Sequence, residues 1–184
     1  MNIAPLGREA TLEDLWEVEG RAELIDGEIV PVTPSGQLPV RAAARIWRSL
    51  DDHEPLHGGG LAVSEGANFV LRTPGLQALS PDAAWWPGDS VVPGPIHGPP
   101  RFAAEVRSLS DYGPAAERAM ALKRARYFAG GTLVVWDVDV IREGVIRAYH
   151  ADDPENPIVF RRGEIADAEP AVPGWRFPVD ELFA

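Results

Sequence analysis

The chain has 184 residues, no cysteine and a formal net charge of −11, and 45% of its residues are hydrophobic. This length and composition fit a folded domain with a real core, and the missing thiols exclude cysteine catalysis, iron–sulfur clusters and disulfide scaffolds. No apolar run approaches the roughly 18 residues of a membrane span, and residues 1–9 lack the basic-then-apolar pattern of a secretory signal, so we expect a cytoplasmic protein.

The predicted elements begin with a helix and a hairpin. Thr11 and Asp14 resemble a capping box that opens a short helix, and Asp26-Gly27 favours a tight turn between two strands. In chain order we predict a helix over 11–19, a hairpin over 21–32, a helix over 40–52, strands over 61–63, 67–71 and 81–86, a loop over 87–100, a strand over 102–108, a helix over 114–128, strands over 132–137, 144–150 and 158–161, and a helical turn over 178–183.

The strand, helix and buried strand between residues 102 and 137 predict a βαβ crossover, and the hairpins on either side indicate a mixed sheet. We therefore predict an α/β fold: a single domain over 1–184 with a mixed central β-sheet flanked by helices and an N-terminal hairpin. Its core covers about 10–150, and residues 151–184 add C-terminal strands and the helical turn.

Acidic and basic side chains are unevenly distributed. Residues 101–127 carry six basic and three acidic side chains, which makes this stretch net positive in an acidic chain. A second basic group lies at helical spacing and consists of Arg41, Arg45 and Arg48. These arginines are either solvent-exposed side chains of their helix without a ligand or, together with Arg124 of the later helix, contacts for a phosphate-bearing ligand.

Two acids on two predicted strands form the main candidate site. Asp82 lies on one strand and Glu105 on another, and Arg107 shares a face with Glu105 because side chains alternate along a strand. Lys123 and Tyr127 are four residues apart on the following helix, so Lys123 could reach both acids and orient a water or stabilise negative charge. The alternative is that these charges only form satisfied ion pairs.

Other polar residues have a structural as well as a functional interpretation. Glu23 either lies close to the site or is an edge-strand charge that resists aggregation. Trp85 and Trp86 could stack on bases, although packing against the core is the more ordinary role. A cluster of metal-binding residue types is interpreted as a solvated loop because Pro55 should break the helical register; it comprises Asp51, Asp52, His53, Glu54 and His57.

The chain resembles the restriction-endonuclease-like family of the PD-(D/E)XK nuclease superfamily over roughly residues 10–150. The resemblance rests on motifs in the expected order: Arg21-Ala22-Glu23-Leu24-Ile25-Asp26-Gly27-Glu28, Pro81-Asp82, Glu105-Val106-x-Ser108, Lys123-x-x-x-Tyr127 and Trp136-x-Val138. Arg107 stands where the superfamily signature has a lysine, and an arginine cannot act as a base. Lys123, supplied from the helix, would therefore take the role of that lysine.

The resemblance implies a Mg²⁺ ion, replaceable by Mn²⁺, bound by Asp82 and Glu105, with Glu23 as an additional acid near the site. It implies metal-assisted hydrolysis of phosphodiester bonds in DNA and a homodimer, because two-fold symmetry suits cleavage of two strands. The acidic composition and Arg107 favour an alternative, a weakly active or inactive nuclease-fold module that binds nucleic acid or a protein partner. A buried ion-pair network without catalysis is a third interpretation.

Overall fold

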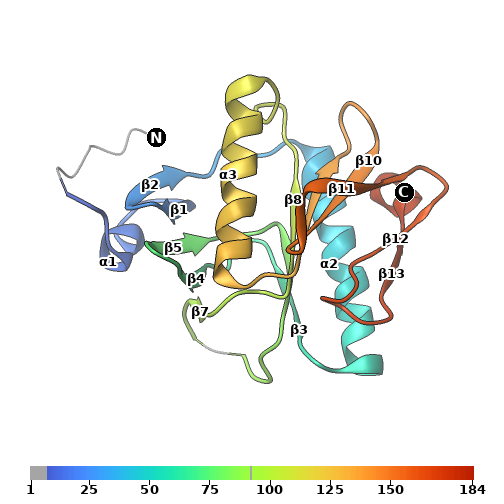
Figure 1. Cartoon of the computed structure of the whole chain (residues 1–184), viewed down its shortest axis with the longest axis horizontal. Helices are drawn as coiled ribbons and strands as arrows, with labels where there is room; N and C mark the ends of the chain where they lie inside the picture. The colour runs from blue at the N-terminus through green and yellow to red at the C-terminus, as the bar shows by residue number, and fades with distance from the viewer. Residues whose placement is uncertain (1–7, 92) are drawn as a thin grey trace.

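The computed structural model describes residues 8–91 and 93–184 and arranges them as two larger β-sheets with helices against them (Figure 1). The first sheet has the strand order β11-β10-β9-β8-β6-β3. Its strands are β3 (Leu61–Ser64), β6 (Ala83–Trp86), β8 (Phe102–Val106), β9 (Val134–Asp139), β10 (Val145–His150) and β11 (Asp153–Arg161).

The second sheet contains the N-terminal hairpin and has the order β2-β1-β5-β4-β7. Its strands are β1 (Ala22–Ile25), β2 (Glu28–Pro31), β4 (Phe69–Arg72), β5 (Leu76–Leu79) and β7 (Ile96–His97), while β12 (Ile165–Asp167) and β13 (Arg176–Pro178) form a separate pair. The helices are α1 (Leu12–Trp16), α2 (Gln37–His57), α3 (Pro114–Gly130) and the 3₁₀ turn η1 (Val179–Phe183).

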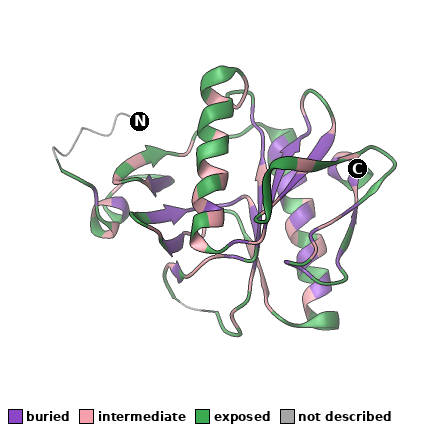
Figure 2. Ribbon diagram, viewed as in Figure 1, coloured by how far each residue is buried: buried purple, intermediate pink, exposed green. Residues whose placement is uncertain are grey.

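The predicted crossover is the centre of the fold. Strands β8 and β9 are parallel neighbours, and α3 connects them. Side chains on one face of β8, such as Phe102 and Ala104, pack in the large core that includes residues of α2, whereas Ala103 joins Tyr127 of α3 in a second core. Figure 1 shows α2 and α3 on either side of β8, and Figure 2 shows that α2 carries both buried and exposed residues. The sheet therefore separates the two helices.

The predicted α/β class, the mixed sheet, its flanking helices and the N-terminal hairpin are confirmed. The capping box is also present, because Asp14 N–H donates to Thr11 Oγ1 and Thr11 N–H donates to Asp14 Oδ2. The strands β5, β7, β12 and β13 were not predicted, and β7 lies within the stretch expected to be loop. These strands are only two to four residues long, too short to show a period of two in the sequence.

The interpretation of residues 51–57 as a solvated loop was wrong. Helix α2 continues through Pro55 to His57, and the rings of His53 and His57 stack with centroids 3.9 Å apart. The helix does not break because Pro55 lies in its last turn, where a proline removes only one hydrogen bond. In addition, the buried His53 packs edge-on against Trp85, with ring centroids 5.8 Å apart, and attaches this turn to the core. Among the described residues, no helix combines the length and apolar character needed to cross a bilayer.

Candidate functional site

The sheet itself brings the acidic residues into line. Asp82 immediately precedes β6, and its N–H donates to the carbonyl of Ala104 at 3.0 Å, which places it beside Glu105 on β8. The β8–β9 register then pairs Glu105 with Asp137. Glu105 and Asp137 each lie two residues after a residue of the core shared with α3, Ala103 and Val135, so these charged side chains point to the α3 face of the sheet.

A cavity of about 290 Å³ lies at this point between the sheet, the hairpin and α3. The residues that line it include Arg21 and Glu23 from the hairpin region, Asp82 and Glu105 from the sheet, and Lys123 from α3. The structure therefore assembles at one cavity five side chains that are spread over a hundred residues of sequence.

Lys123 joins two of the acids. Its Nζ lies 2.7 Å from Glu105 Oε2 and 2.9 Å from Glu23 Oε1. The three side chains are 18%, 17% and 6% exposed, respectively, so the contacts are largely shielded from water. Lys123 is the only lysine in the chain, since all the other cationic side chains at neutral pH are arginines. This composition singles out Lys123, because it is the one position in the sequence with a compact ammonium group.

The remaining contacts fix each carboxylate in place. Asp82 Oδ2 accepts the N–H of Val106 at 2.7 Å, and Glu23 Oε1 accepts the N–H of Ser80 at 2.6 Å. The buried Tyr127 hydroxyl donates to Glu105 Oε1 at 2.8 Å. Both oxygens of Glu105 are therefore held by residues of α3: Oε1 by Tyr127 and Oε2 by Lys123, which lies one helical turn before Tyr127.

Burial and mutual repulsion govern protonation in this cluster. Burial raises the pKa of Glu105 to about 8, partly offset by Lys123 and reinforced by the neighbouring charges of Asp82 and Glu23. Burial likewise raises the pKa of Asp82, which the Val106 N–H and Lys123 partly counteract. Burial lowers the pKa of Lys123, but the charges of Glu105 and Glu23 outweigh it and leave the pKa above its ordinary value. The ammonium group therefore stays charged, while the pKa of Glu105 is about 8.

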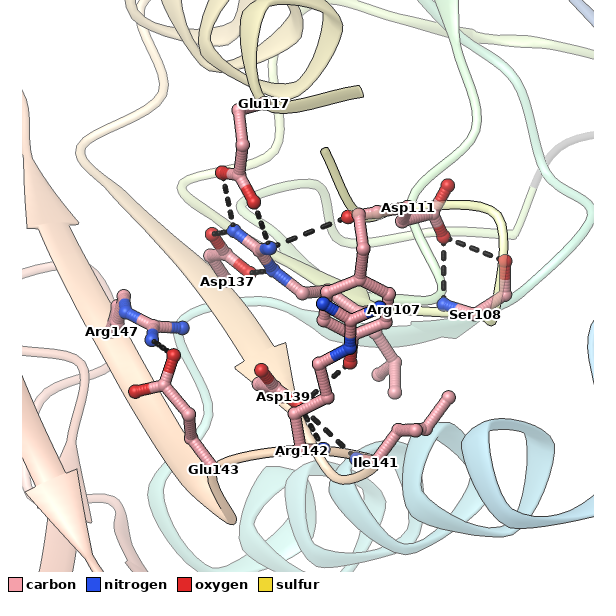
Figure 3. Close-up of polar contacts among 12 residues, drawn as sticks. Arg107, Ser108, Asp111, Glu117, Asp137, Asp139, Ile141, Arg142, Glu143 and Arg147 are labelled. Carbon is pink, nitrogen blue, oxygen red and sulfur yellow. Dashed lines mark hydrogen bonds and ion pairs between the residues drawn. The ribbon is translucent and has the colours of Figure 1, made fainter. Parts of the chain in front are cut away.

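Arg107 lies at the same cavity but is already paired. Its Nε and Nη2 donate to the two carboxylate oxygens of Asp137 at 2.6 and 2.7 Å, and Nη2 also donates to Glu117 Oε2 at 2.9 Å (Figure 3). Asp137 and Glu117 were not expected to take part in the site. Asp137 ends a β-branched apolar run, and only the strand register shows that it is next to Glu105.

The structure brings Arg124 to the cavity and leaves the predicted arginines of α2 away from it. Arg124 lines the cavity and lies over the ring of Tyr149 at 3.9 Å. The three arginines of α2 do not line it, because α2 packs on the opposite face of the sheet; they are Arg41, Arg45 and Arg48. The α2 arginines therefore do not share this cavity with Arg124. Trp85 is 1% exposed and belongs to the main core.

The donor chemistry at the cavity fits a hard divalent cation. Within residues 8–91 and 93–184, no three acidic or histidine side chains converge closely enough to form a metal site on their own. Mg²⁺ is commonly held by only one or two carboxylates, with water and substrate phosphate completing its shell. Asp82 and Glu105 supply this minimal set, because each carboxylate oxygen retains a lone pair beyond the hydrogen bonds it accepts.

Comparisons with known proteins agree with this fold. The chain is similar to a crystal structure described as "a putative nuclease belonging to DUF820" from Anabaena variabilis, with a TM-score of 0.73, 15% sequence identity, and coverage of 94% of this chain and 97% of that one. A search of curated proteins found no match. The model of the family described as "Uma2: Putative restriction endonuclease" matches residues 11–180. The chain therefore belongs to the Uma2 family, which is PD-(D/E)XK-like.

Proposed function

We propose that this protein is a Mg²⁺-dependent endonuclease that hydrolyses phosphodiester bonds in DNA at the cavity between α3 and the sheet. The observation that carries the proposal is the placement of the chain's only lysine between Glu105 and Glu23, beside Asp82. The family supports it, because its description names a restriction endonuclease. The family does not define the substrate of this chain, so DNA is part of the proposal.

In this proposal Asp82 and Glu105 hold the cation, which when bound supplies a more acidic water and charge neutralisation at the phosphate. Lys123 Nζ, 2.7 Å from Glu105 Oε2, orients the attacking water and stabilises the negative charge that develops in the transition state. Because its pKa is raised, Lys123 acts as a charged hydrogen-bond donor and not as a base. Tyr127 and Glu23 position Glu105 and Lys123.

An alternative function is a nuclease-fold module that binds nucleic acid or a protein partner with little or no hydrolysis. The observation that favours it is the pairing of Arg107 with Asp137 and Glu117, because these two carboxylates neutralise the Arg107 guanidinium group in the free protein. The two functions differ in a measurable way, because only the nuclease turns over DNA.

The test is nicking of supercoiled plasmid DNA by purified protein in Mg²⁺, in Mn²⁺ and in EDTA. We expect metal-dependent nicking that is lost in Asp82→Ala and Glu105→Ala and retained in Asp89→Ala, an acid outside the cavity. Activity that survives in both site variants would refute the assignment of the site. DNA binding without turnover in any metal would favour the alternative. Light scattering of the same samples tests whether the active species is a homodimer.

A further inference from the structure

The guanidinium group of Arg107 has two sides of very different character. On one side it forms a bidentate pair with Asp137, a carboxylate that is 1% exposed. On the other side it forms a second bidentate pair with Glu117, whose side chain is 50% exposed (Figure 3). The carbonyl of Asp111 accepts the remaining contact from Nη1 at 3.3 Å. Arg107 is thus fully occupied, but only Glu117 can exchange with solvent without disturbing the buried sheet.

Two further arginines, Arg124 and Arg147, lie near the carboxylate of Asp137. Arg124 Nη1 is 3.8 Å from Asp137 Oδ2, and Arg147 of β10 is the register partner of Asp137. Arg147 Nη2 pairs with Glu143, whereas its buried Nη1 has no hydrogen-bond partner among the described residues. The hydrogen bond from Arg107 lowers the pKa of Glu117 most, and the charges of Arg107, Arg147 and Arg124 lower it further. Glu117 is therefore an anion at neutral pH within reach of three arginine charges.

A bidentate carboxylate occupies an arginine in the same way as a phosphate, with two oxygens facing two N–H groups. The charges of Arg107, Arg124 and Arg147 all act on Glu117, while Asp137 pairs with Arg107 and Glu143 pairs with Arg147. The contact of Arg124 with Asp137 is longer, at 3.8 Å. Arg107 and Arg124 both line the cavity that contains Asp82 and Glu105. A phosphate of a nucleic-acid strand that passes through this cavity would meet the guanidinium edge that Glu117 now covers.

We infer that Glu117 is an internal substitute for a substrate phosphate, and that a phosphate of the nucleic-acid strand displaces it to bind Arg107 and Arg124. Asp137 holds Arg107 in place during the exchange, because the Asp137 carboxylate is buried and stays paired with the guanidinium group. Glu117 leaves by rotation of its side chain, which is 50% exposed in the first turn of α3. This inference rests on the proposed function in that it takes the nucleic-acid strand as the ligand of the cavity.

The test measures binding and not cleavage. A short fluorescein-labelled DNA duplex is titrated with protein in EDTA by fluorescence anisotropy at constant salt. Glu117→Gln keeps the shape of the side chain and removes its charge, so we expect the duplex to bind about fivefold more tightly, because competition for Arg107 is lost. The matched control is Glu143→Gln, which removes the same charge from another half-exposed glutamate paired with an arginine. It should change affinity by about twofold or less, since salt screens a charge that does not compete.

The effect of Glu117→Gln should vanish in an Arg107→Lys background, because a lysine offers no fork for two oxygens. If Arg107→Lys does not fold, the same comparison in Arg124→Gln should show a reduced effect. Equal affinities for Glu117→Gln and Glu143→Gln, with a lower melting temperature for Glu117→Gln alone, would overturn the inference and make the pair a structural latch. Because the assay contains no metal, loss of nicking in Asp82→Ala and tightening in Glu117→Gln are independent results.

Discussion

Replacing Lys123 with methionine removes the cation that contacts both Glu105 and Glu23 while keeping the length of the side chain. Methionine leaves two buried carboxylates facing each other beside Asp82. Breaking a buried ion pair by removing one partner typically costs about 3–5 kcal/mol. The variant is therefore expected to lose stability, and the size of the loss should depend on whether Glu105 is ionised.

The pH dependence follows from Glu105. Burial raises the pKa of this carboxyl from 4.5 to about 8, so folding takes up a proton and the contribution of this group to stability falls as pH rises through that range. Without Lys123 the pKa of Glu105 rises further, and the fall continues above pH 8. At pH 6, where Glu105 is protonated, we expect a loss of about 2 kcal/mol, the value of a hydrogen bond to a charged group. At pH 9 the loss should reach about 4 kcal/mol.

The assay is urea unfolding of the wild-type and variant proteins in EDTA at pH 6 and pH 9. The control is Arg126→Met, because Arg126 lies on the same helix and forms a more exposed pair with Asp26, for which a change of about 1 kcal/mol or less is expected at both pH values. Excess Mg²⁺ should restore part of the stability of Lys123→Met at pH 9 by replacing the lost positive charge. A variant that is as stable as the wild type at pH 9, or whose loss is the same at both pH values, would refute the reasoning.

Two other predictions concern the cation and the core. Glu105 must lose a proton to bind a cation, so the affinity for Mn²⁺ measured by calorimetry should rise from pH 6.5 to 8.5 in the wild type and not in Glu105→Gln. A wild-type affinity that does not change with pH would contradict the raised pKa of Glu105. Trp136→Ala should lower the free energy of unfolding by about 3–5 kcal/mol, because its fully buried ring packs on those of Trp175 and Phe102, with centroids 5.0 Å apart in each pair. Trp16→Ala should change it little, since Trp16 is 53% exposed. Equal losses of the two variants in urea unfolding would contradict this packing.

Local signals in the sequence were enough for the elements that carry strong patterns. The Asp26-Gly27 turn, the capping box at Thr11 and the helix ended by Gly131 all involve contacts within a few residues, and each is present. The helix break expected at Pro55 is absent because a distant contact, His53 against Trp85, outweighs a local preference.

The sequence by itself determined the crossover, the two acids and the lysine of the candidate site, since β-branched periodicity and helical spacing are local properties. Only the tertiary structure decided what each charge does. Strand register places Asp137 beside Glu105 and therefore within reach of Arg107, and the sheet places the α2 arginines on the far side from the cavity. Electrostatic pairing depends on distances of a few ångströms between residues far apart in the chain, and no local pattern encodes such distances.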